Sequence, residues 1–138
     1  MTLPGDIREH NRKLIEEFRA RGGRVPGRPL LLLTTIGRRS GLPRTTPMMV
    51  VPDRDRLLVI ASNAGAPRHP EWYRNLLVNP TVTVEVDGAT YPATATPLQG
   101  EEYTQTVARI VERYPFFREH QAGISRRIPV VALVRRPG

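Results

Sequence analysis

Residues 30–47 read LLLLTTIGRRSGLPRTTP, an apolar run followed by a basic loop. The first seven residues predict a buried strand, since a short apolar stretch that ends at a turn signal is typical of one. The loop then places three arginines, Arg38, Arg39 and Arg44, within seven residues. Guanidinium groups and accessible backbone N–H groups in one turn suit a phosphate or a carboxylate. We therefore expect an anion-binding loop at the end of a buried strand.

The rest of the chain alternates short strands with turns and helices. Val82, Val84 and Val86 alternate with polar residues, which predicts a half-buried strand, and Asp87-Gly88 after them is a strong hairpin signal. Pro92 in the returning strand favours an edge position or a bulge. The expected elements are, in order, a helix over 6–21 capped by Asp6, strands over 30–36, 47–51 and 57–62, a helix that starts at Pro70 and stops at Asn79-Pro80, strands over 81–86 and 91–96, a helix over 99–114 and a strand over 129–135.

Short antiparallel strands joined by tight turns, with helices at intervals, indicate an α+β fold with a barrel-like sheet rather than a βαβ fold. At 138 residues the chain is long enough for one core and too short for two ordinary domains. We divide it into an N-terminal helix with its connector, residues 1–28, and a barrel domain, residues 29–138.

The chain is strongly basic, with a formal net charge of +8 and Lys13 as its only lysine. A basic balance favours an anionic partner. No helix-turn-helix, zinc-finger or RNP pattern is present, so nucleic-acid binding is not expected. The absence of cysteine excludes disulfides and thiolate catalysis, and the three histidines lack metal-ligand spacing. Without an apolar run of ~20 residues or an apolar leader we expect a cytoplasmic protein, and peripheral membrane contact through the N-terminal helix stays open.

Three blocks of the sequence resemble the deazaflavin-dependent nitroreductase family, split β-barrel reductases that use coenzyme F-420. The blocks are residues 33–41 with 43–47, residues 61–66 with 69–76 and 79–80, and residues 113–115 with 127–130. The resemblance covers about residues 29–134. It implies a split β-barrel of about six mainly antiparallel strands with flanking helices. It also implies an oxidoreductase in which reduced F-420 supplies a hydride to an electrophilic small molecule such as a quinone, an enone or a nitro compound.

The resemblance further implies which residues hold this cofactor, a polyanion with a phosphodiester, an oligoglutamate tail and a flat tricyclic ring. In such proteins the loop equivalent to Arg38, Arg39 and Ser40 holds the phosphate and the acidic tail, with Arg44 beside it. Strand alternation predicts that Met48 and Met49 point to opposite sides, one of them toward the ring. The other residues expected around the cofactor are Thr45, Thr46, Pro47, Ile60, Ala61, Ser62, Asn63, Glu71, Trp72, Tyr73, Arg74, Asn75 and Phe117.

The electron acceptor is expected beside five residues. The proton for the reduced acceptor is expected to come from one of two of these residues or from water. The five are Met49, Ser62, Tyr114, Phe117 and His120, and the proton donors among them are Ser62 and Tyr114. Family members often carry lysine where this chain has Asn63. The nitroimidazole-reducing member of the family has tyrosines in place of Met49, Phe117 and His120. The resemblance therefore does not imply that this chain reduces nitroimidazoles.

Two alternatives stay open at this point. One is that the same barrel holds FMN or FAD, as in pyridoxamine-oxidase-like relatives. The other is a non-catalytic protein that carries F-420 or binds another polyanion such as RNA. An exposed barrel edge also leaves a homodimer open.

Overall fold

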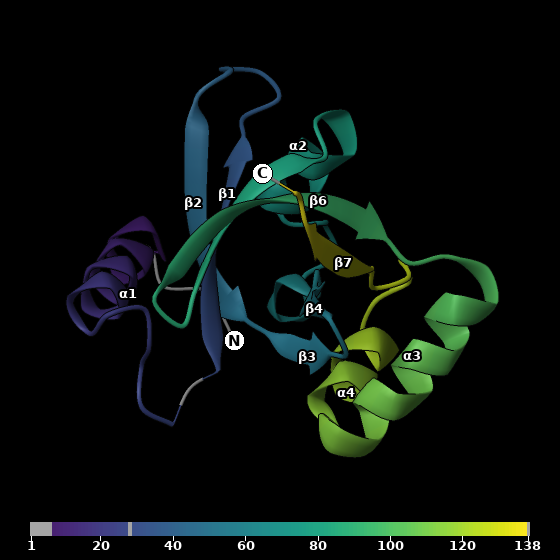
Figure 1. Cartoon of the computed structure of the whole chain (residues 1–138). Coiled ribbons are helices and arrows are strands. Elements are labelled where there is room, and N and C mark those ends of the chain that lie inside the picture. The colour runs from purple at the N-terminus through teal and green to yellow at the C-terminus, as the bar shows by residue number, and fades with distance from the viewer. Residues whose placement is uncertain (1–6, 28, 138) are drawn as a thin grey trace.

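The computed structural model describes residues 7–27 and 29–137, and these form one seven-stranded sheet with four α-helices (Figure 1). The helices are α1 (Ile7–Ala20), α2 (Glu71–Val78), α3 (Gly100–Arg113) and α4 (Phe116–Ala122), with a short 3₁₀ turn, η1 (Asn63–Gly65). The strands are β1 (Leu30–Ile36), β2 (Pro43–Met49), β3 (Val51–Asp53), β4 (Arg56–Ile60), β5 (Thr81–Val86), β6 (Ala89–Pro97) and β7 (Val130–Arg135).

The sheet curls into a barrel because its two edge strands are consecutive in the sequence. The strand order is β2-β1-β5-β6-β7-β4-β3, and every neighbouring pair is antiparallel. The edge strands β2 and β3 are separated in sequence only by Val50, whose N–H donates to the carbonyl of Pro29 at 2.9 Å. The two edges are therefore held close together, as Figure 1 shows. The predicted α+β split barrel is confirmed, with seven strands instead of about six.

Side chains of the sheet alternate between two apolar clusters. The interior cluster includes Leu31, Leu33 and Val84, and α2 contributes Trp72 and Leu76 to it. The second cluster lies between the sheet and the helices α3 and α4, and its buried members are Val51, Leu58, Leu98, Tyr103, Ile110, Phe117, Ile128, Val130 and Ala132. Each helix thus covers the sheet through its own apolar face.

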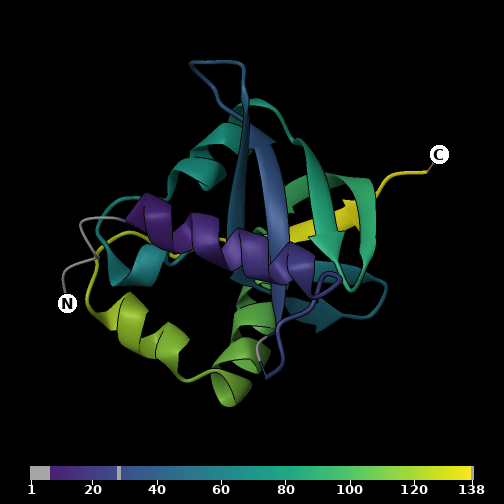
Figure 2. The ribbon, with the colours of Figure 1, turned by 90° about the vertical axis from the view of Figure 1, so that its left-hand side faces the viewer.

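The N-terminal helix α1 packs against the outside of the barrel (Figure 2). Phe18 of α1 and Val25 of the connector form a small cluster with Leu32, which points away from the interior because its neighbours in β1 point inward. Ion pairs of Arg19 with Glu85 and of Arg24 with Asp87 tie the helix and connector to the β5–β6 hairpin. The predicted cap, Asp6, lies outside the described residues.

Four details differ from the sequence-based expectation. The strand predicted over 47–51 is parts of two strands: β2 begins at Pro43, which shortens the loop after β1, and ends at Met49, while β3 begins at Val51. Pro70 is the N-cap of α2, with an extended ψ of 154°, and is not its first helical residue. Pro92 lies in an interior strand without a bulge, and its carbonyl accepts a hydrogen bond from the N–H of Arg136 at 2.9 Å. The helix α4, which directly follows Pro115, was not predicted.

Candidate functional site

The basic loop between β1 and β2 is a closed turn held by its own hydrogen bonds. The N–H of Gly37 donates to the carbonyl of Leu42, and the N–H of Gly41 donates to the carbonyl of Gly37, both at 2.8 Å. The hydroxyl of Ser40 accepts from the N–H of Leu42 at 3.1 Å. A Cβ on Gly37 would lie 2.5 Å from this hydroxyl oxygen, so a larger residue there would displace the Ser40 side chain from its place in the turn. The loop is therefore a preformed structure.

One arginine of the loop is fixed to helix α2 by a buried amide. The Oδ1 of Asn75 accepts from the backbone N–H of Arg38 at 3.2 Å and from its guanidinium at 3.3 Å. The amide nitrogen of Asn75 donates to the hydroxyl of Thr35 in β1 at 3.1 Å. Asn75 is only 5% exposed. These bonds fasten the loop to β1 and α2 together and set the direction of Arg38.

Positive charge is in excess around this arginine. Arg38 forms an ion pair with Glu71, the first residue of α2. The hydrogen bond from Arg38, followed by the charges of Arg38, Arg74 and Arg39, lowers the pKa of the Glu71 carboxyl. Arg39 and Arg44 are exposed, and the Cγ of Arg44 lies 3.8 Å from where a Cβ on Gly37 would be. Several guanidinium groups thus surround a single carboxylate.

The residues predicted along β2 divide between its two faces. In the register with β1, Thr46 and Met48 lie opposite the inward residues Leu33 and Leu31, and Met48 joins the interior cluster. Met49 instead packs against the second cluster. The expected alternation of the two methionines is therefore confirmed. Thr45, whose hydroxyl bonds to that of Thr34 at 2.8 Å, and Pro47 share the face of Met49.

An apolar wall gathers most of the residues expected near the acceptor. Met49 and Ile60 from the strands and Tyr114 after α3 are half-buried and pack against one cluster. Phe117 of α4 is a buried member of that cluster, with 2% exposure. Trp72, Tyr73 and Ala61 belong to the interior cluster instead. The structure thus brings Met49, Tyr114 and Phe117 of the predicted acceptor side together, in a different cluster from these three residues.

The loop after β4 lies beneath α4 and carries Ser62 and Asn63. Ser62 is buried, and the amide of Asn63 donates to the carbonyl of Arg68 at 3.0 Å. Asn63 and Ala64 have left-handed φ angles of 52° and 54°, which is unfavourable for a side chain with a Cβ. His120 of α4 covers this turn: a Cβ on Gly65 would lie 3.4 Å from its ring, and its buried Nδ1 has no hydrogen-bond partner among the described residues.

A residue that sequence reasoning missed, Arg126, holds this loop in place. Its guanidinium donates to the carbonyls of Ala61, Ser62 and Ala66 at 2.8–3.2 Å, and one of its nitrogens lies 3.2 Å from Nδ1 of His69. Burial lowers the pKa of the Arg126 guanidinium. Burial, followed by the charges of Arg126 and Arg74, also lowers the pKa of His69. The only signal in the sequence was the paired arginine before Ile128-Pro129.

Comparison with known proteins identifies the family of the chain. The family model described as F-420H(2)-dependent quinone reductase matches residues 6–135. The chain belongs to this family. It is an oxidoreductase whose cofactor is coenzyme F-420, as the resemblance of the three sequence blocks implied.

Individual relatives agree with this assignment. The F-420H(2)-dependent quinone reductase Rv1261c of Mycobacterium tuberculosis (strain H37Rv) is 40% identical over 119 residues, covering 83% of this chain and 80% of that protein. A solved structure described as an F-420-H2 dependent reductase (FDR-A) is 40% identical, with a TM-score of 0.69 and coverage of 77% of this chain and 94% of its own. A structure described as a domain-swapped dimer is 38% identical, with a TM-score of 0.72 and coverage of 92% and 96%.

The charges of the basic loop in this chain fit the cofactor F-420. F-420 carries a phosphodiester and several carboxylates, and the loop supplies fixed and exposed guanidinium groups in excess over one acidic side chain. The apolar wall around Met49 and Phe117 has the character that a flat ring requires. Among residues 7–27 and 29–137 no helix is long and apolar enough to cross a membrane.

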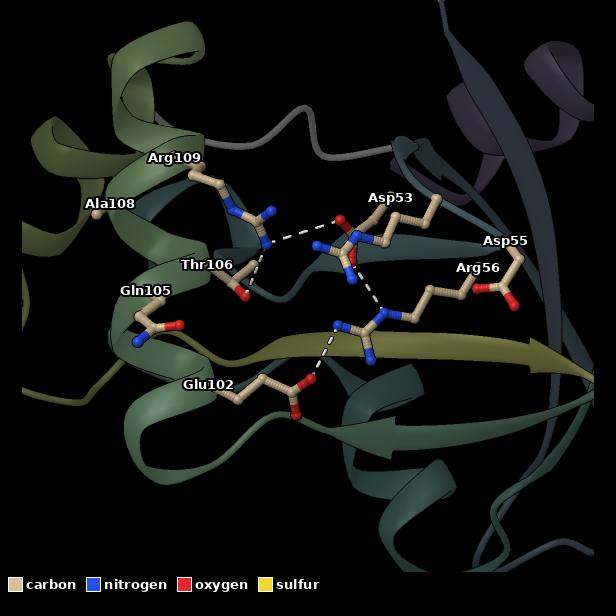
Figure 3. A pocket seen from close by; sticks show the side chains of 9 residues that line it. Asp53, Asp55, Arg56, Glu102, Gln105, Thr106, Ala108 and Arg109 are labelled. Carbon is tan, nitrogen blue, oxygen red and sulfur yellow. Dashed lines mark hydrogen bonds and ion pairs between the residues drawn. The ribbon is translucent and has the colours of Figure 1, made fainter.

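A separate hollow of the described surface lies between α3 and the β3–β4 turn (Figure 3). Arg56 pairs with Asp53 at 2.9 Å and with Glu102 at 3.0 Å, and Arg109 approaches Asp53 at 3.6 Å. Figure 3 shows these side chains reaching across the hollow from both walls. Because its acids and bases neutralise one another, we assign the network to holding α3 on the barrel. A smaller adjoining hollow ends at Tyr114.

Proposed function

We propose that this chain reduces a quinone-type acceptor with F-420H2, and that Arg38, Arg39 and Arg44 hold the phosphate and the glutamate tail of the cofactor. The single observation that carries the site assignment is the fixed loop: Asn75 directs Arg38 while Arg39 and Arg44 remain exposed. A preformed cationic turn binds an anion without the cost of ordering its own backbone. Ser40 shapes the turn through its bond to Leu42.

The apolar wall is where we place the ring and the acceptor. Met49 and Ile60 offer an uncharged, half-buried surface that is backed by the buried ring of Phe117, and Ser62 follows the end of β4 by two residues. The helix α4 covers the η1 turn and, in the proposal, keeps water away from the reacting atoms. Thr46, Met48, Trp72 and Tyr73 then act by supporting the barrel behind this surface.

When bound, reduced F-420 supplies a hydride, so the protein needs no nucleophile of its own. The remaining tasks for this chain are to orient the acceptor and to provide a proton to its reduced oxygen. The hydroxyls of Ser62 and Tyr114 are the groups that we assign to this proton transfer, since Tyr114 packs against the apolar wall and Ser62 follows Ile60 of that wall by two residues. In the same proposal the chain forms a homodimer, which the dimeric relative of 38% identity supports.

A fluorescence titration with F-420 beside FMN tests the cofactor site. We expect binding of F-420 and turnover of a soluble quinone with F-420H2. Arg39→Ala should weaken F-420 binding about tenfold, the effect of losing a charge-assisted hydrogen bond of about 1.5 kcal/mol. The control is Arg21→Ala, which removes the same charge from an exposed residue after α1. Tight FMN binding without F-420 binding would refute the proposal, as would equal effects of the two substitutions.

A further inference from the structure

The least exposed arginine of the basic loop, Arg38, already forms an ion pair with a carboxylate of the same chain. The guanidinium of Arg38 pairs with the carboxylate of Glu71, where a phosphate or carboxylate of the cofactor would bind in the proposed function. We infer that Glu71 is a placeholder that occupies Arg38 in the free protein, is displaced by the acidic part of F-420, and thereby sets the affinity for the cofactor. This inference rests on the proposed function.

Arg38 does not need Glu71 to be positioned. Asn75 accepts from both the backbone and the guanidinium of Arg38, and Asn75 is itself held by Thr35. The side chain of Arg38 is 19% exposed, so its course is fixed mainly by this buried support. Loss of the Glu71 carboxylate should therefore leave the guanidinium in place and available. Because Asn75 already orients Arg38, Glu71 is not needed for that purpose.

Glu71, in contrast, is free to move away. Its side chain is 72% exposed, and the bond from Arg38 is the only hydrogen bond that its carboxylate accepts within the described residues. Ion pairs with so exposed a partner contribute little net free energy, because water solvates the Glu71 carboxylate well once it leaves Arg38. Displacement by a ligand with several negative charges is therefore inexpensive, while a single small anion gains little over the carboxylate that is already there. The placeholder should favour polyanions over small anions.

The charge balance of the loop supports the same role. Glu71 is the carboxylate on which Arg38, Arg39 and Arg74 act together. Removing it makes the loop more positive by one unit and ends the competition for Arg38. Both effects increase the attraction for a polyanion, and both weaken with salt since the Debye length falls to about 3 Å at 1 M.

The test measures F-420 affinity by fluorescence for the wild type, Glu71→Gln and Glu71→Ala. We expect both variants to bind F-420 about 1.4-fold to 5-fold more tightly at low ionic strength, the range that corresponds to an exposed ion pair. The gain should shrink at about 1 M salt. The matched control is Glu101→Gln, which removes an exposed acid from the first turn of α3. It should leave the affinity unchanged.

A second substitution separates the inference from the proposed function. Arg38→Ala should weaken F-420 binding if the loop holds the cofactor. If it does so while the Glu71 variants bind as the wild type or more weakly, Glu71 is not a placeholder and only this inference fails. If Arg38→Ala leaves the affinity unchanged, the loop does not hold the cofactor and the proposed function fails as well.

Discussion

Arg126 offers the sharpest test of how this site is built. Its guanidinium bonds to three carbonyls of one loop and contacts His69, from positions 57 to 65 residues away in the sequence. The loop contains Asn63 and Ala64 in left-handed conformations, each with a cost of about 1 kcal/mol or more. Such strain persists only where surrounding bonds hold the backbone. Arg126 supplies these bonds, so its loss should release the loop.

The expected magnitude follows from these contacts. A net value of about 1 kcal/mol for each of three carbonyls gives a loss of about 3 kcal/mol in the free energy of unfolding for Arg126→Ala. For a domain of this size that corresponds to a decrease in Tm of about 10 °C. Arg126→Lys keeps the charge but offers a compact ammonium in place of the planar fork, so it should recover only part of this loss.

The assay is urea unfolding, with hydrogen exchange over residues 62–68 as the local readout. Arg127→Ala is the matched control: the adjacent arginine lies over the ring of Tyr103 at 3.4 Å, an exposed contact of about 0.5–1 kcal/mol. We expect fast exchange in the loop for Arg126→Ala only. Equal destabilisation by the two substitutions, or a lysine variant as stable as the wild type, would refute this reasoning.

Two further predictions concern the basic loop, and a third concerns His69 beside Arg126. Asn75→Ala should cost about 1–3 kcal/mol in urea unfolding, because it leaves the buried hydroxyl of Thr35 and the N–H of Arg38 without their partner; a loss below about 0.5 kcal/mol would contradict this. Gly37→Ala should lower Tm in the wild type but not in a Ser40→Ala background, because the added Cβ clashes with the Ser40 hydroxyl; equal losses in both backgrounds would show that the clash is not the cause. His69 has a pKa below its unfolded value, so its neutral form contributes stability that is present above about pH 6.5 and is lost as the pH falls through the folded pKa. Urea unfolding between pH 5 and 8 should show this loss in the wild type and in the control His10→Gln but not in His69→Gln, and an unchanged pH profile in His69→Gln would contradict it.

Local sequence patterns predicted most of the sheet correctly. They gave wrong element boundaries near prolines. The valine alternation and the Asp87-Gly88 turn gave β5 and its hairpin correctly, since both signals lie within a few residues. The sequence pattern assigns the first part of β2, from Pro43 to Thr46, to the basic loop because it predicts a strand that begins only at Pro47. Both prolines are tolerated in β2 because this strand pairs on one side only, with β1. Pro115 read as a helix end, yet it also caps the next helix, α4.

The candidate site was predictable in its charges but not in its supports. Three arginines in one loop point to an anion without any knowledge of the fold. The roles of Asn75 and Arg126 depend on partners 37 to 65 residues away, which only the closed barrel brings near. Trp72 and Tyr73 could likewise be placed on the helix α2, but no local pattern shows that they enter the barrel interior.

The single residue between β2 and β3 has a consequence for how this protein tolerates changes in length. An insertion at Val50 would turn every following side chain of the strand to the opposite face, and so would misplace one barrel edge against the other. The turn at Arg54-Asp55 is exposed and sits between paired strands, so an added peptide there leaves both registers intact. A reporter tag or new chain termini therefore belong at this turn, and natural length variation should avoid residues 43–53.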